Sequence, residues 1–184
     1  MRLNVIDKES GVCLYERVWK WKRSVGAGTS VRTGVCNLIL TFLAMKASLN
    51  DAGESAKYVI FKQAKGGGKK SERRNAQSAV VSGAFSSTHQ IRLVFIEKWG
   101  VLAALFHDAS MDWELVQTFL EKTLSGFCEK YEGEVDPLRE DLEAIAAEED
   151  KPGASAGHRT QEEIIQIFIG FDSFVSSLAL DHFV

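Results

Sequence analysis

The chain lacks the short motifs by which many enzymes are identified from sequence. It contains no G-x-S-x-G motif, and no two histidines have metal-ligand spacing or pair with cysteine: they are His89, His107, His158 and His182. Residues 65–71 are rich in glycine and lysine, but Lys69 stands where a phosphate-binding loop needs its second glycine. We therefore expect no enzymatic activity, no catalytic residue, no bound metal and no cofactor.

Cysteines and long apolar runs are also scarce. The three cysteines, Cys13, Cys36 and Cys128, lie far apart and form no C-x-x-C motif, which indicates buried, reduced thiols. No uninterrupted apolar run approaches the roughly 18 residues that span a bilayer, and the amino terminus has no apolar signal-peptide region. These absences predict a cytosolic or nuclear protein without a transmembrane segment.

The composition is that of an ordinary globular protein. Of 184 residues, 45% are hydrophobic and 26% are charged, and this length is sufficient for one domain with a substantial core. The net charge of −3 argues against bulk attraction to nucleic acid or to an anionic membrane. Residues 1–184 are therefore expected to form a single domain.

The order of the hydrophobic segments carries most of the information. Extended patterns, alternating or fully apolar, occur at residues 3–6, 12–21, 58–61, 91–96 and 101–107. Amphipathic helical periodicity occurs at residues 31–49, 112–131 and 162–183. The resulting order, β-β-α-β-β-β-α-α, predicts an α+β fold, and the unbroken apolar run at 101–107 predicts a central strand.

Two segments interrupt this order. Residues 65–80 begin as a basic, glycine-rich stretch and are expected to form a loop insertion. Residues 132–159 are an acidic insertion that is either flexible or contains a short solvated helix, with its apolar residues at Leu138, Leu142 and Ile145. A capping box at Thr160 and Glu163 predicts the start of the last helix.

Tryptophan and basic side chains supply the candidate interaction residues. Trp99 is expected in a tight turn and Trp113 in the first turn of a helix, and exposed tryptophan commonly anchors protein interfaces. Packing against the ends of the sheet is the alternative role. The basic end of the first hairpin, with residues 65–74, could bind acidic partners or phosphoinositides, or could simply be solvated. The candidate interface residues are Arg17, Trp19, Trp21, Lys22, Arg23, Trp99 and Trp113.

The segment order resembles the longin, or SNARE-like, fold, in which a five-stranded antiparallel sheet lies between one helix and two helices. The opening of the chain is similar to that of the sybindin-type small core subunits of the TRAPP tethering complex. The residues that carry this similarity are Val-Ile-Asp-Lys at 5–8, Gly-Val-Cys-Leu-Tyr at 11–15, and Glu16, Trp19, Lys22 and Arg23. Residues 171–178 resemble the closing helix of that family. Residues 91–106 and 114–131 resemble equally the N-terminal longin-type domain of the signal-recognition-particle receptor alpha subunit.

This resemblance implies a non-enzymatic subunit of an intracellular membrane-trafficking complex that acts through protein–protein contacts. Such a subunit would be cytoplasmic and peripheral to endoplasmic reticulum or Golgi membranes, and its partners would be other longin-type subunits and, as one option, a small GTPase. A receptor-type longin domain that docks a small GTPase during protein targeting is one alternative. A ligand-sensing or enzymatic α+β domain is another, and it would need a pocket near His107, Asp108 and Trp113. There His107 and Asp108 could form an acid/base pair, or Asp108 could simply precede a helix.

Overall fold

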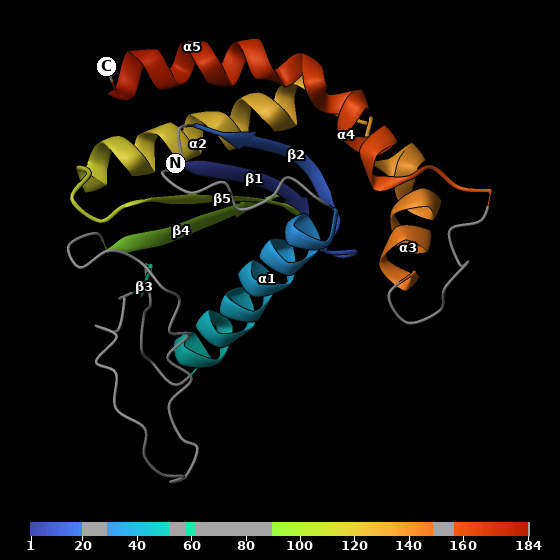
Figure 1. Ribbon diagram of the computed structural model, residues 1–184, viewed down its shortest axis with the longest axis horizontal. Helices are drawn as coiled ribbons and strands as arrows, with labels where there is room; N and C mark the ends of the chain where they lie inside the picture. The colour runs from blue at the N-terminus through green and yellow to red at the C-terminus, as the bar shows by residue number, and fades with distance from the viewer. Residues whose placement is uncertain (20–28, 52–57, 62–89, 149–156, 184) are drawn as a thin grey trace, which may run out of the picture.

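A computed structural model describes residues 1–19, 29–51, 58–61, 90–148 and 157–183. Five strands form one antiparallel sheet in the order β2-β1-β5-β4-β3, flanked by helices, so the chain has an α+β fold (Figure 1). The strands are β1 Arg2–Asp7, β2 Cys13–Val18, β3 Val59–Phe61, β4 Ile91–Lys98 and β5 Val101–Asp108. Every residue of β5 from 101 to 107 is buried, which confirms the prediction of a central strand.

Two hairpins place the strand ends. In the first, β1 pairs with β2 from Arg2 opposite Val18 to Ile6 opposite Cys13. In the second, β4 pairs with β5 through a two-residue turn, because Lys98 lies opposite Val101. Since β1 also pairs with β5, the turns of both hairpins lie at the same end of the sheet. We call this end the turn end.

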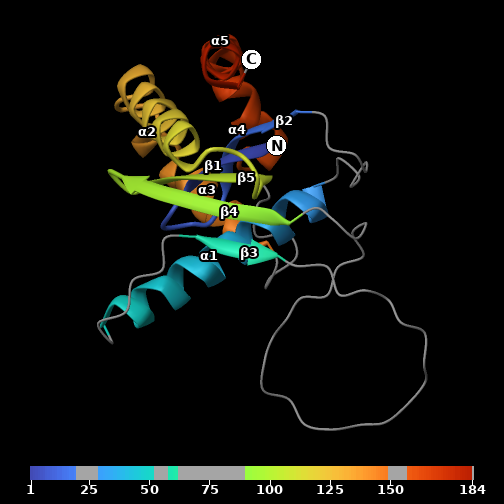
Figure 2. The same ribbon diagram turned by 90° about the vertical axis from the view of Figure 1, so that its left-hand side faces the viewer.

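The sheet separates two apolar cores. Helix α1 (Thr29–Asp51) covers one face, where Cys36 and Ile39 pack with Ile6, Leu93 and Leu102. Figure 2 shows α1 on the opposite side of the sheet from α2 (Trp113–Lys130) and α5 (Asp172–Phe183). The sheet therefore lies between one helix on one face and a second layer of helices on the other.

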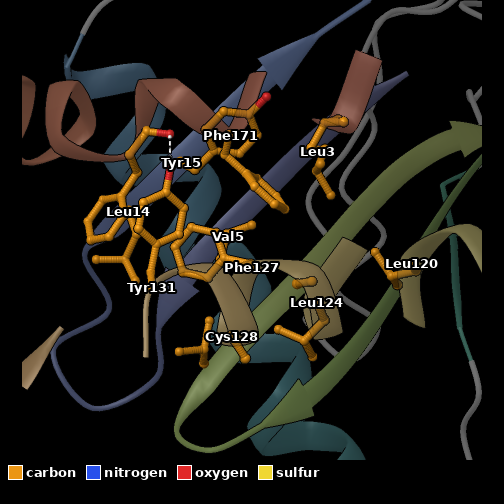
Figure 3. Close-up of a cluster of buried hydrophobic side chains, with 14 of the residues drawn as sticks. Leu3, Val5, Leu14, Tyr15, Leu120, Leu124, Phe127, Cys128, Tyr131 and Phe171 are labelled. Atoms are coloured by element: carbon orange, nitrogen blue, oxygen red, sulfur yellow. Dashed lines mark hydrogen bonds between the residues drawn. The ribbon is translucent and has the colours of Figure 1, made fainter. Parts of the chain in front are cut away.

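The second core is larger and richer in aromatic side chains. Strand residues Leu3 and Val5 and helix residues Phe127 and Phe171 converge there (Figure 3). The ring of Phe127 lies 5.2 Å from that of Phe171 in an edge-to-face contact, a favoured geometry for aromatic pairs. Helix α2 begins at the N-cap Asp112, whose carboxylate accepts hydrogen bonds from two backbone amides of the first turn.

The last helix is not continuous, which corrects the expectation of one helix over 162–183. The structure divides it into α4 (Gln161–Phe168), a short 3₁₀ segment η2 (Ile169–Phe171) and α5. Two donors from the end of α2 bind carbonyls at the break: Lys130 Nζ binds Gly170 O at 2.6 Å, and Tyr131 Oη binds Phe168 O at 3.3 Å. The predicted capping box at Thr160 and Glu163 is confirmed at the start of α4.

Residues 161–183 bear on the expectation that no segment spans a membrane. The stretch Gln161–Phe183 is 23 residues long and, by length and composition, is apolar enough to cross a bilayer. The stretch contains no long uninterrupted apolar run, because polar residues are interspersed along it. In the structure, Ile164, Phe168 and Val175 of this stretch pack in the second core, and 28% of its most apolar window is buried.

The acidic insertion contains a helix, which resolves the choice left open by the sequence. A short 3₁₀ segment, η1 (Asp136–Leu138), leads into α3 (Arg139–Ala147). This helix is not fully solvated, because Leu142 is buried in the second core, as is Leu138 in the preceding η1. Residues 65–80, the other predicted insertion, lie outside the described residues.

Candidate functional site

The structure places the described candidate tryptophans at opposite ends of the sheet. Trp19 follows β2 beside the amino terminus, and Trp113 lies over Arg92 near the start of β4. Trp99 lies in the β4–β5 turn, at the turn end. Trp21, Lys22 and Arg23, like the basic residues 65–74, lie outside the described residues. The described candidate interface residues therefore do not form one continuous surface.

Arg17 and Trp19 hold the second helical layer against β2. The Arg17 guanidinium forms an ion pair with Asp172 at the start of α5. Tyr15 donates a hydrogen bond of 2.8 Å to the same carboxylate, and burial, followed by this bond, raises the pKa of Tyr15. The Trp19 ring packs edge-to-face on Phe119, with 6.1 Å between ring centres. These contacts provide a structural role for both candidates.

Trp113 belongs to an aromatic and cationic cluster at the end opposite the turns. Its ring centre lies 5.4 Å from that of Tyr58. The Arg92 guanidinium lies over both rings, 4.5 Å from the Tyr58 centre and 5.7 Å from the Trp113 centre. Trp113 is only half-buried, so the packing role and an interface role are both compatible with its position.

His107 and Asp108 do not contact one another as an acid/base pair would. His107 has no exposed surface, and its Nδ1 lies 2.8 Å from the backbone carbonyl of Asp108. The Asp108 carboxylate instead accepts two hydrogen bonds from Ser110, at 2.9 and 2.7 Å. Burial lowers the pKa of His107, so the neutral imidazole is favoured. Asp112, and not Asp108, caps the following helix.

Trp99 is the most exposed large hydrophobic side chain in the described part of the chain, with 68% of its surface accessible. Its backbone φ is +52°, and that of the following Gly100 is +74°. The Lys98 ammonium lies 4.5 Å from the indole ring centre and donates a hydrogen bond of 3.4 Å to Ser125 on α2. The Trp99 ring is therefore exposed to solvent, while Lys98, which contacts it, is hydrogen-bonded to α2.

The first hairpin braces this turn. The Lys8 amide donates to the Gly100 carbonyl at 2.8 Å, and the Lys8 ammonium pairs with Glu97 at 2.6 Å. Helix α3 joins the same end, because Arg139 donates to both oxygens of the buried Asp7 carboxylate at 3.0 Å. The turn of the first hairpin therefore supports the turn that holds Trp99, and α3 is attached to the first hairpin through Asp7. The sequence located the turn but could not show this support.

The cysteines are all buried, as the sequence indicates. Cys13 on β2 and Cys36 on α1 lie within hydrogen-bonding reach of one another, which their wide separation in sequence did not suggest. That contact, with burial, raises the pKa of the Cys36 thiol. Within the described ranges, no group of three or more His, Cys, Asp or Glu side chains is placed to hold a metal ion.

A scan against protein-family models and searches of curated proteins and solved structures find no match for this chain. The established class is therefore an α+β protein with a five-stranded antiparallel sheet between helical layers.

Proposed function

We propose that this chain is a longin-type subunit of an intracellular membrane-trafficking complex and acts through protein–protein contacts. The arrangement of the layers carries the proposal. A five-stranded antiparallel sheet has α1 on one face and α2, α4 and α5 on the other, which is the plan expected from the longin resemblance.

The accessible chemistry of the described residues favours contact over catalysis. His107, the candidate base, has no exposed surface, whereas Trp99 presents a large aromatic ring to solvent. Among the described strands, β2 and β3 are at the edges of the sheet, and edge strands can pair with a strand of a partner. The proposed partners are other longin-type subunits and, as one option, a small GTPase. The proposed location is the cytoplasmic surface of endoplasmic reticulum or Golgi membranes.

Affinity purification tests this proposal. The tagged full chain would be expressed in its native cells, cross-linked gently and purified, and the associated proteins identified by mass spectrometry. We expect several small longin-type subunits to be recovered in near-equal amounts. Recovery of one GTPase with protein-targeting components would instead support the receptor-type alternative. A well-folded chain that remains monomeric and recovers no trafficking component would contradict both.

A further inference from the structure

The backbone at Trp99 is unfavourable for tryptophan. A two-residue hairpin turn with positive φ at both positions is a type I′ turn, which favours Asn followed by Gly. Gly100 suits the second position, but Trp99, at φ +52°, is the only non-glycine residue with positive φ in the described ranges. Bulky side chains are uncommon in this conformation. The turn itself therefore gives no reason for tryptophan at this position.

The apolar core gives no reason either, because most of the Trp99 ring is exposed. The Lys98 ammonium contacts the ring and is in turn bonded to Ser125, so it limits the freedom of the ring. An aromatic side chain that is already oriented loses little conformational entropy on binding. Exposure, an unfavourable backbone and a restrained ring together favour a role for Trp99 in recognition.

The charges around Trp99 indicate what it recognises. The cationic groups are engaged within the fold: Lys98 with Trp99 and Ser125, and Arg139 with Asp7. Lys8 is partly exposed but forms an ion pair with Glu97. The most exposed charges at this end are acidic. The Glu9 and Asp136 side chains are 74% and 89% exposed, although both approach Arg139. A partner complementary to this end would therefore present basic groups around an apolar centre.

From these observations we infer that the turn end docks a partner protein, with Trp99 inserted into an apolar pocket rimmed by lysine and arginine. This inference rests on the proposed function, and it identifies the turn end as the surface that contacts the partner subunit. An anionic bilayer is a poorer fit, because Glu9 and Asp136 would face lipid phosphates. The surface consists of Trp99, Lys98, Lys8, Glu9 and Asp136.

The first test replaces Trp99→Asn in the tagged full chain and compares it with Trp99→Phe. Asparagine suits the type I′ turn, so the melting temperature should stay unchanged or rise by about 2–4 °C. Recovery of the partner subunit should nevertheless fall at least about tenfold, as expected for the loss of an interface anchor. Phenylalanine keeps an aromatic ring and should retain most of the recovery.

The second test examines charge. The double variant Glu9→Lys and Asp136→Lys should slow association with the purified partner by about tenfold, and the difference from wild type should shrink at high salt. Asp181→Lys, which reverses one charge, is the control, since Asp181 is exposed near the end of α5 and away from the turn end. A photo-cross-linking aromatic amino acid at position 99 should join to a partner peptide that contains apolar residues flanked by lysine or arginine.

The outcomes distinguish failure of the docking inference from failure of the proposed function. If Trp99→Asn recovers the same subunits in the same amounts as wild type, the docking inference is wrong and the proposed function stands. A fall of more than about 5 °C in melting temperature with Trp99→Asn would also overturn the inference by assigning Trp99 a structural role. Cross-linking to lipid would overturn the choice of a protein partner. If wild type recovers no trafficking subunit, both proposals fail.

Discussion

At the residue scale, the α2–α5 contact depends on one missing side chain. Gly126 on α2 faces the Phe174 ring so closely that an added Cβ would lie 2.6 Å from the nearest ring atom. Contacts this short do not occur between real side chains, so either Phe174 or α5 would have to move. The nearest atoms belong to the far end of the Phe174 ring, so an added Cβ would displace this ring from its stacking contact with Phe171.

We predict that Gly126→Ala destabilises the protein by about 1–3 kcal/mol, because overpacking outweighs the gain in helix propensity. The matched control is Gly34→Ala on the exposed side of α1, where no atom lies within 4 Å of the added Cβ. That change should stabilise the protein by about 0.5–1 kcal/mol. Urea unfolding of both variants measures the difference, and equal shifts in the two variants would contradict the tight α2–α5 contact.

His107 provides a prediction for pH. Burial, as the largest cause, lowers its pKa in the folded state, and the nearby Arg92 adds to the effect. The unfolded state therefore binds more protons than the folded state below about pH 6.5, the ordinary histidine value. Folding stability should be retained above this pH and decline as the pH falls below it, by at most about 1.4 kcal/mol per pH unit from this residue.

The check is a series of urea unfolding curves between about pH 5 and pH 8. His107→Gln should show a shallower dependence on pH than wild type, because the titrating group has been removed. His158→Gln, at an exposed position, is the control. If His107→Gln has the same dependence of unfolding free energy on pH as wild type, groups other than His107 are responsible for it.

At the element scale, α3 is held to the sheet by a polar contact. Arg139 at its first position binds the Asp7 carboxylate, which is 2% exposed and also accepts two hydrogen bonds from Ser10. Leu142 supplies the apolar part of the attachment. The acidic segment therefore forms a helix that is attached to the sheet, although it has few large apolar residues: Arg139 pairs with the buried Asp7 carboxylate and Leu142 enters the core.

We predict that Arg139→Met lowers the free energy of unfolding by about 1–3 kcal/mol, because Asp7 then keeps a buried charge without its cation. Hydrogen exchange should accelerate most strongly in α3. Arg159→Met is the matched control: Arg159 pairs with Asp141 at a more exposed position, so its loss should be much smaller. Similar losses in both variants would show that α3 does not depend on the Asp7 contact.

The elements also show which features sequence can predict. The apolar run of β5 and the capping box at Thr160 depend on neighbouring residues, and both appear in the structure as expected. The break at Gly170 depends on donors from α2, some 40 residues earlier in the chain. Trp19 is packed because Phe119 of α2 lies beside the end of β2, whereas Trp99 at the β4–β5 turn stays mostly exposed. Neither outcome is visible in the local sequence. Local patterns therefore located the strands and most helices, whereas tertiary contacts decided the candidate site.

At the scale of the whole molecule, both cores depend on β5. Leu102 and Ala104 contribute to the core under α1, while Ala103 and Leu105 contribute to the core under α2. If β5 leaves the sheet, both cores lose their central residues at once. The described part of the chain should therefore unfold as one cooperative unit, although its two helical layers do not share a face of the sheet.

The buried thiols can test whether the two cores unfold together, because each core contains at least one cysteine. Cys13 and Cys36 lie in the core under α1, and Cys128 lies in the core under α2. We predict that an aromatic disulfide reagent labels none of them in the folded protein. In increasing urea, the Cys128→Ala variant reports on Cys13 and Cys36, and the double variant Cys13→Ala and Cys36→Ala reports on Cys128. Both should show the same midpoint for labelling as for the loss of helical circular dichroism. Earlier labelling of Cys13 and Cys36 than of Cys128 would mean that α1 detaches by itself, and the sheet with the second helical layer would then be the independent folding unit.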